Sequence, residues 1–272
     1  MSYLKNVREK MAMENLLREE EESPTLNRLS FDKDKVQIML VGDEHIGNAN
    51  HNRDKLLKNL DWAYNNGIYV LHMGDGVEGA TRSSIGDGVY TQEQIFDEQI
   101  AEWVAIYKPF ADDKRFIGAH VGNHEARAFK DDGVNVMRGM CRQIGGKYLG
   151  IGKTHLINVR KQSYTMYTTH GASGARLPYT KIKGALDLER IVDVDIYAMG
   201  HVHQLSHHIR EQYRVDKRMK KIIKEPKHFI LTGSYLSYWN SYAQVKSMEP
   251  SRQGSPLLTL FGGEKQINVS TQ

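Results

Sequence analysis

Apolar and polar positions along the chain follow two alternating patterns, one typical of strands and one of helices. The apolar run 36–41 predicts a buried strand, and apolar residues at 56, 57, 60 and 64 predict a helix that ends near Gly67. We expect further strands over 68–71, 116–121, 154–160, 163–169 and 195–199, and further helices over 91–107, 134–144 and 179–190. The chain is β-rich after residue 205. Alternating strands and helices followed by strands predict a layered α/β domain.

Two segments differ from this pattern. Residues 1–35 are highly charged and have only a weak apolar stripe, and an acidic run at 19–22 precedes Ser23-Pro24. We predict that they form a helical arm outside a single domain over 36–272, either solvated or packed against a partner. A homo-oligomer could form through this arm. Residues 76–90 contain four glycines without periodicity and predict a long loop.

Composition limits the class of protein. With 272 residues and 40% hydrophobic content, the chain is long enough for one large domain and its core. Cys141 is the only cysteine, which excludes an intramolecular disulfide and suits a reducing compartment, so we expect a cytoplasmic protein. No run approaches the roughly 20 apolar residues of a membrane helix, and the N-terminus has no apolar signal region. The net charge of +4 does not by itself indicate nucleic-acid binding.

Polar side chains follow five of the predicted strands at the point where each strand ends. In order they are Asp43 and His45, then Asp75, then Asn123 with His124, then His170, then His201 and His203. Residues i and i+2 of an extended segment point to the same side, so Asp43 and His45 can converge. One Asp-x-His pair arises often by chance. Five strand ends together indicate one shared site, because sites in open α/β sheets form outside the carboxyl ends of strands.

The chemistry of this set predicts a metal centre. Carboxylate, carboxamide and imidazole groups without thiolate suit manganese, iron or zinc. The set has more ligands than one catalytic ion with an open position can use, which indicates two ions. Two ions roughly 3.5–4 Å apart need a bridging carboxylate and can hold a hydroxide between them. We expect two divalent ions, with manganese favoured over iron or zinc.

The motifs DEH, GD, GNHE, HG and GHVH, in this order, resemble the calcineurin-like metallophosphoesterase superfamily over about residues 36–261. The resemblance implies a four-layer α-β-β-α sandwich of two mixed sheets flanked by helices, with a dinuclear centre. By the family's pattern one metal is held by Asp43, His45, Asp75 and His203. The second metal shares Asp75 as a bridge and is completed by Asn123, His170 and His201.

The resemblance also implies a reaction, the hydrolysis of phosphoesters. A hydroxide held between the metals would attack phosphorus in line. His124 would not bind metal but would protonate the leaving oxygen, which a group with an ordinary pKa of about 6.5 can do near neutral pH. Glu125, which stands where many family members have aspartate, would orient His124.

The segment 209–228 bears on the substrate, because it holds eight Lys and Arg residues against three acidic ones. It is either a solvated β-hairpin whose charges protect a sheet edge, or a basic arm that follows a polyanionic backbone. The residues that could contact phosphates are Arg127, Arg176, Lys217, Arg218, Lys220 and Lys221. Tyr235, Tyr238, Trp239 and Tyr242 could stack on bases, although core packing also explains such aromatic residues.

The motif order, the basic arm and the tail GSYL…SYA…GSPLLTL resemble the nuclease branch of the superfamily, which includes double-strand-break-repair nucleases and small bacterial and phage phosphoesterases. The first hypothesis is therefore phosphodiester hydrolysis on DNA. The alternatives are a phosphomonoesterase or a diesterase of small nucleotides, and a non-catalytic binding scaffold. The intact ligand set together with His124 argues against the scaffold.

Overall fold

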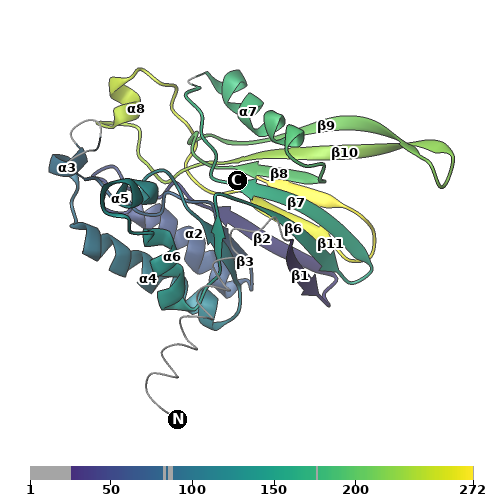
Figure 1. The fold of residues 1–272 in the computed structure, drawn as a ribbon, viewed down its shortest axis with the longest axis horizontal. Helices are drawn as coiled ribbons and strands as arrows, with labels where there is room; N and C mark the ends of the chain where they lie inside the picture. Colours follow the sequence, from purple (N-terminus) through teal and green to yellow (C-terminus); the bar gives the residue numbers. More distant parts are fainter. Residues whose placement is uncertain (1–25, 82–83, 85–87, 176, 272) are drawn as a thin grey trace, which may run out of the picture.

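A computed structural model describes residues 26–81, 84, 88–175 and 177–271. Within these ranges two six-stranded sheets face each other, and helices cover their outer faces (Figure 1). The arrangement is the four-layer α-β-β-α sandwich expected from the sequence. No helix in the described ranges is long and apolar enough to cross a membrane.

The first sheet has the strand order β12-β11-β2-β3-β4-β5. Strands β2, β3, β4 and β5 pair in parallel, whereas β11 pairs antiparallel with both β2 and β12. Their bounds are β2 Lys35–Val41, β3 Tyr69–His72, β4 Phe116–His120, β5 Tyr148–Gly150, β11 Leu257–Phe261 and β12 Ile267–Ser270. The four parallel strands therefore end on the same edge of the sheet.

The second sheet has the order β1-β6-β7-β8-β10-β9. Strands β7, β8 and β10 are parallel, β6 is antiparallel to β7, and β9 is antiparallel to β10. Their bounds are β1 Asn27–Phe31, β6 Gly152–Val159, β7 Gln162–Thr169, β8 Ile196–Met199, β9 Leu205–Asp216 and β10 Lys221–Thr232. Strand β9 forms the outer edge, and with β10 it makes a long hairpin that extends away from the body (Figure 1).

Helices flank each sheet on its outer side. The first sheet is covered by α2 Arg53–Asn65, α4 Phe96–Asp112, α5 Glu125–Asp132 and α6 Val136–Ile144, and the second by α7 Pro178–Asp187 and the 3-10 turn Leu188–Arg190. Two short helices, α3 Gly88–Thr91 and α8 Tyr242–Val245, lie in long connections.

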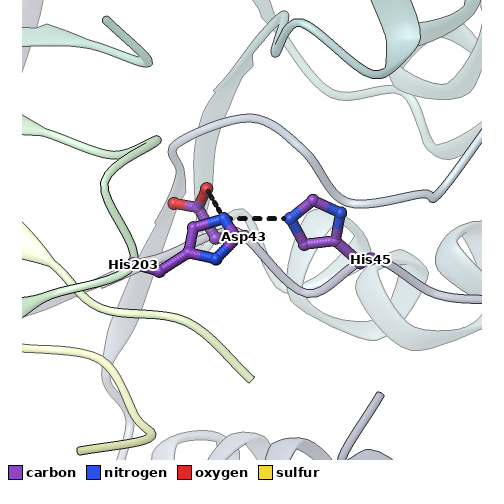
Figure 2. Close-up of side chains that lie close together, drawn as sticks. All are labelled: Asp43, His45 and His203. Atoms are coloured by element: carbon purple, nitrogen blue, oxygen red, sulfur yellow. Dashed lines mark hydrogen bonds and ion pairs between the residues drawn. The ribbon is translucent and has the colours of Figure 1, made fainter. Parts of the chain in front are cut away.

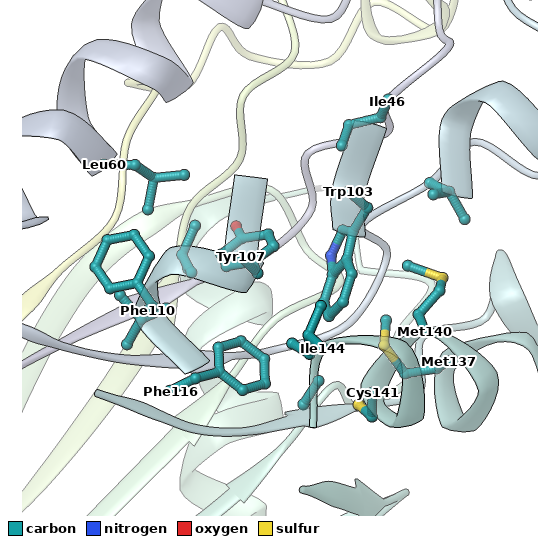
Figure 3. Packing of buried hydrophobic residues seen from close by; sticks show 14 of the residues in the cluster. Ile46, Leu60, Trp103, Tyr107, Phe110, Phe116, Met137, Met140, Cys141 and Ile144 are labelled. Atoms are coloured by element: carbon teal, nitrogen blue, oxygen red, sulfur yellow. The ribbon is translucent and has the colours of Figure 1, made fainter. Parts of the chain in front are cut away.

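Three apolar clusters fill the spaces between the four layers. Trp103 and Tyr107 of α4 are fully buried in the cluster between the helices and the first sheet (Figure 3). The cluster between the sheets contains Ile38 and Ile230, and the third lies under α7 and contains Phe229. Burial of this apolar surface holds the strand ends of both sheets in fixed positions.

Two predicted boundaries were wrong. Residues 27–31, which we assigned to the charged arm, form β1, because Asn27 is buried and its amide lies 3.0 Å from Nδ1 of His155. The rest of the predicted arm, residues 1–25, lies outside the described residues. Helix α4 begins at Phe96 and not at 91, since Glu98 caps the N–H of Ile95 over 3.1 Å.

Candidate metal centre

The predicted site residues lie where the carboxyl ends of the two sheets meet. Asp43 follows β2 and Asp75 follows β3, and the two loops are joined by backbone hydrogen bonds from Asp43 to Gly74 and from His45 to Asp75. Loops after β4, β7 and β8 bring the remaining groups, so both sheets contribute. Asp43, His45, Asp75 and His170 are buried, whereas His201 and His203 are partly exposed and Asn123 is exposed.

The backbone at this site adopts an unusual conformation. Asp43, His45, Asp75, His201 and His203 all have φ between 51° and 68°. They are half of the ten non-glycine residues with positive φ in the described part of the chain. Such left-handed conformations cost roughly 1–3 kcal/mol each and concentrate at functional sites. Asp43 and His45 therefore converge through two tight turns. The prediction that they lie on one extended segment was wrong.

Asp43, His45 and His203 form the first group of facing ligand atoms (Figure 2). Nε2 of His203 lies 3.2 Å from Oδ1 of Asp43 and 3.2 Å from Nε2 of His45. Asp43 and His45 come from the loop after β2 of the first sheet, and His203 comes from the loop after β8 of the second. Their ligand atoms point toward one another.

The second group contains Asp75, Asn123, His170 and His201. Nε2 of His170 lies 3.2 Å from Oδ2 of Asp75 and 3.0 Å from Oδ1 of Asn123. Nδ1 of His201 is 2.7 Å from the same Asn123 oxygen. The two groups are adjacent, because Oδ2 of Asp75 also lies 4.0 Å from Nε2 of His45. Asp75 thus stands between them, as a bridging carboxylate must.

Acceptors around the histidines determine which ring nitrogens face the centre. Nδ1 of His170 donates to the carbonyl of Met73 over 2.9 Å, and Nε2 of His201 lies 3.2 Å from the carbonyl of Ser173. Nδ1 of His45 lies 3.1 Å from the carboxylate of Glu78. Partners of this kind fix the tautomer and leave the opposite nitrogen free to bind a metal ion.

Electrostatics at the centre favour a cation. Burial by itself would raise the pKa of Asp75, but His170 and His124 hold it well below its ordinary value. Burial would likewise lower the pKa of His170, yet the Asp75 carboxylate raises it to about 10. The pKa of His45 is lowered, first by burial. The carboxylates are therefore ionised and attract positive charge.

The donor set fits divalent metal ions. Two ligand atoms of an ion bound at about 2.0–2.2 Å lie roughly 2.8–3.6 Å apart, and the contacts of 3.0–3.2 Å around His203 and His170 are in this range. A pair of facing imidazole nitrogens such as His45 and His203 gains little from its own contact. Two metal ions, one bound in each group, would give the facing ligand atoms of both groups a partner.

His124 lies beside the centre and is oriented by other groups. Its Nδ1 donates to the carbonyl of Glu78 over 2.7 Å, and Arg127 donates from Nη2 to its Nε2 over 2.9 Å. Its backbone N–H donates to Oδ1 of Asp75 over 2.8 Å. Nε2 of His124 lies 3.9 Å from Oδ2 of Asp75 and so faces the centre.

The sequence predicted that Glu125 orients His124, but the Glu125 carboxylate binds backbone groups instead. Its buried carboxylate accepts hydrogen bonds from the backbone N–H groups of four residues, at 2.7–3.2 Å: Asp75, Gly76, Val77 and Gly122. A Cβ on Gly122 would lie only 2.0 Å from Oδ1 of Asp75. Glu125 and Gly122 therefore position the Asp75 loop, and the groups that form hydrogen bonds with the His124 ring are Glu78 and Arg127.

The predicted substrate residues separate into two places. Arg127 is at the centre, whereas the basic residues Lys217, Arg218, Lys220 and Lys221 lie at the exposed end of the β9–β10 hairpin. Asp216 is 13 positions beyond His203, so this end lies about 40 Å from the centre along the strand. Arg176 lies outside the described residues. Tyr235 is fully buried in the core, and Trp239 is 71% exposed.

Sequence reasoning did not identify Glu78 and Glu44. Glu78 contacts both His45 and His124. Burial alone would raise the pKa of Glu78, but the hydrogen bond to His45 lowers that pKa to about 2. Glu44 lies between two proposed ligands, and its fully buried carboxylate accepts from the Tyr107 hydroxyl and faces His72. Only their position beside motif residues could have indicated these roles.

Comparison with known proteins finds similar solved structures. No family model matches the chain, and no curated protein matches it. A conserved uncharacterized protein of Streptococcus pneumoniae TIGR4, titled a predicted phosphoesterase, has a TM-score of 0.38 and 12% identity, over 88% of this chain and 91% of the other. A solution NMR structure of a Thermotoga maritima protein has a TM-score of 0.36 and 14% identity, over 87% and 99%. Both TM-scores are below 0.5.

Proposed function

We propose that this chain is a dinuclear-metal-dependent phosphoesterase of the calcineurin-like superfamily, and that it hydrolyses phosphodiester bonds. The observation behind the proposal is that two groups of facing ligand atoms adjoin at Asp75. Asp43, His45, Asp75 and His203 would hold one ion, and Asp75, Asn123, His170 and His201 the other. A scaffold without catalysis would gain nothing from five strained residues converging there.

Bound divalent ions would supply positive charge for the phosphoryl oxygens and lower the pKa of a water molecule toward neutrality. The chain's own residues supply the remaining functions. His124 faces the centre through Nε2. When this nitrogen carries a proton in place of the hydrogen bond from Arg127, it can pass that proton to a leaving oxygen. Arg127, beside that nitrogen, adds a guanidinium that can pair with a phosphoryl oxygen. Glu125 and Gly122 hold Asp75 in position.

DNA is the substrate that we propose first, on the strength of the exposed basic residues at the hairpin end. A second candidate, a small nucleotide diester or monoester, is favoured by a specific observation. Four cations nearer the hairpin base are paired with acidic residues: Arg210 with Glu189, Arg214 with Glu225, Lys224 with Glu211 and Lys227 with Asp193. A cation that is already paired with a carboxylate neutralises a phosphate of a polyanion less effectively.

The test is an activity panel with wild type and Asp75→Asn, each with and without manganese. The substrates are single-stranded and duplex DNA, RNA, a bis-nitrophenyl phosphodiester and the matching monoester. We expect manganese-dependent diester hydrolysis by the wild type, and loss of at least one metal and nearly all turnover in Asp75→Asn. Two ions retained with full activity in that variant would exclude the dinuclear assignment, and a preference for the monoester would select the second candidate.

A further inference from the structure

Lys181 is a buried cation of helix α7 to which the proposed function gives no role. The residue is only 8% exposed. Within the described part of the chain its ammonium takes part in no hydrogen bond and no ion pair. Burial of a charge without an acceptor is costly, and lysine is rarely buried unless it is paired. The position of Lys181 therefore calls for an acceptor that the described residues do not supply.

The charge of Glu249 acts on Lys181 only from a distance. Glu249 is an exposed residue in the segment after α8. Burial lowers the pKa of the Lys181 ammonium, and the Glu249 carboxylate opposes this lowering. Nζ of Lys181 is not among the unpartnered side-chain atoms that the described chain seals from solvent. An anion from outside can therefore reach the ammonium.

The fold directs this side chain toward the candidate metal centre. Lys181, Ala185 and Leu188 are buried at spacings of four and three residues, so they lie on the face of the helix that covers the second sheet. Helix α7 joins the parallel strands β7 and β8, so it begins at the edge of the sheet where these strands end (Figure 1). Side chains on a helix lean toward its N-terminus. The Lys181 side chain is therefore directed toward the edge that carries the proposed ligands.

Met199 connects this face of α7 to the loop of a proposed ligand. A Cβ on Gly184, three residues after Lys181, would lie 2.8 Å from Cε of Met199. A Cβ on Gly171, which directly follows His170, would lie 2.6 Å from Cγ of the same side chain. The helix thus packs against the strand end beside His170. Lys181 lies about 4.5 Å further along the helix axis toward the N-terminal end of α7.

We propose that Lys181 is a substrate-binding residue, and that its ammonium pairs with a second phosphate of the substrate, next to the phosphate that is hydrolysed. The proposal rests on the proposed function, because the metal centre would bind the phosphate that is hydrolysed. It also narrows the substrate class to nucleotide diesters that carry at least two phosphate groups, as a short oligonucleotide does. Lysine binds a phosphate as a point charge.

Lys181 and Arg127 would contact different parts of such a substrate. Arg127 lies in α5, after β4 of the first sheet, and its guanidinium is beside His124. Lys181 lies after β7 of the second sheet. The two cations therefore approach the centre from different sheets, and one phosphate on each would fix the direction in which the substrate lies across the metals.

A binding measurement tests the role of Lys181 without turnover. The ligands are a thymidine dinucleotide, which has one phosphate, and the same dinucleotide with a further phosphate at its 5′ or 3′ end. They are titrated calorimetrically into manganese-loaded His124→Ala protein with and without Lys181→Met. With Lys181 present, a terminal phosphate should raise the affinity by about 10-fold or more. In Lys181→Met this gain should disappear, and the slope of log K against log[salt] for the phosphorylated ligand should become shallower by about 0.7.

Lys183→Met is the matched control, because Lys183 is an exposed cation of the same helix that already pairs with Asp187. It should keep the gain. Methionine retains an unbranched apolar chain at 181, so Lys181→Met should unfold at the wild-type denaturant concentration or above it, since a buried charge is removed. An equal gain from the terminal phosphate with and without Lys181, or no gain in either protein, would overturn the proposal.

Hydrolysis of the unphosphorylated dinucleotide decides the proposed function separately. In an otherwise wild-type chain, Lys181→Met should hydrolyse this ligand as the wild type does, because the ligand has no second phosphate. Manganese-dependent hydrolysis together with an equal affinity gain would leave the phosphodiesterase in place and remove Lys181 from it. Absence of hydrolysis by the wild type would instead contradict the proposed function.

Discussion

Arg127 donates a hydrogen bond to Nε2 of His124, the nitrogen that faces the candidate metal centre, over 2.9 Å. The opposite nitrogen, Nδ1, is held by the carbonyl of Glu78. In this arrangement the imidazole has a fixed orientation and its Nε2 acts as an acceptor. A phosphoryl group entering the centre would meet the guanidinium and the imidazole together, which ties the roles of the two residues to each other.

The first prediction concerns Arg127. Arg127→Gln should lower kcat/KM for a phosphodiester by about 10- to 150-fold, because a hydrogen bond to a charged group contributes roughly 1.5–3 kcal/mol. Metal content should not change, since Arg127 is not among the proposed ligands. Arg127→Lys keeps the charge without the planar fork and should recover part of the activity. Steady-state kinetics with metal analysis would check this, and unchanged kinetics in Arg127→Gln would exclude a role in substrate binding.

The second prediction separates His124 from the ligands. His124→Ala should retain both metals and react more slowly by roughly 10²–10⁴, the range typical of a general acid. Esters with good leaving groups should be affected less, because they need little protonation. The measurement compares a nitrophenyl diester with an alkyl diester, and His170→Ala serves as the control that releases metal. Metal release in His124→Ala would contradict the assignment.

The third prediction concerns Glu125, whose two oxygens accept four backbone N–H groups. Glu125→Gln replaces one of these oxygens with a donor and leaves buried N–H groups unpaired, each at about 1–3 kcal/mol. The variant should unfold at lower denaturant concentration and bind metal more weakly. Gly122→Ala should also weaken metal binding, because its Cβ would meet Asp75. Wild-type stability and metal affinity in both variants would show that the Asp75 loop is positioned by other contacts.

Much of this site was predictable from the sequence, and its supporting contacts were not. Glycine and polar residues at strand ends are visible along the chain, so Asp43, Asp75 and His170 could be grouped before their distances were known. The role of Glu125 could not be predicted, since it depends on the backbone of a loop about 50 positions earlier. Strand β1 was missed for a similar reason. Its pairing partner, β6, is more than 120 residues away, and a five-residue strand beside charged residues has no periodicity long enough to identify it.

The fourth prediction is a dependence of stability on pH that arises outside the metal centre. His120 and His155 are buried between the sheets, at 2.6 and 2.7 Å from the same hydroxyl, that of Thr168. Burial lowers the pKa of His120 to about 3 and that of His155 well below its ordinary 6.5. The unfolded chain therefore binds protons below pH 6.5 that the folded chain does not. The contribution of these two histidines to the free energy of unfolding should be constant above pH 6.5. Below pH 6.5 it should fall by about 1.4 kcal/mol per pH unit for each histidine.

Denaturant unfolding at pH 7.5 and pH 5 would measure this effect. His120→Gln removes one titrating group and should show a smaller decrease in stability between the two pH values than the wild type, although it is less stable at pH 7.5. His208→Gln, at an exposed histidine on β9, should behave as the wild type does. Equal pH dependence in His120→Gln and wild type would show that His120 is protonated in the folded protein.

The last prediction concerns the exposed cations at the end of the β9–β10 hairpin. If they follow a DNA backbone, the slope of log K against log[salt] should become shallower by about 0.7–0.9 for each phosphate that a variant no longer neutralises. Replacing Lys217, Arg218, Lys220 and Lys221 with Gln should therefore weaken DNA binding uniformly across sequences. Hydrolysis of a small nitrophenyl diester should not change, because this end of the hairpin is about 40 Å from the centre along the strand.

The matched control replaces paired cations of the same hairpin, Arg214 and Lys224, with Gln. These side chains already bind Glu225 and Glu211, so their replacement should change the salt slope less than replacement of the exposed set. If the exposed-set variant instead keeps both the DNA affinity and the salt slope of the wild type, the hairpin does not bind nucleic acid. The centre would then favour a small phosphoester, with Arg127 beside His124 as a candidate substrate cation.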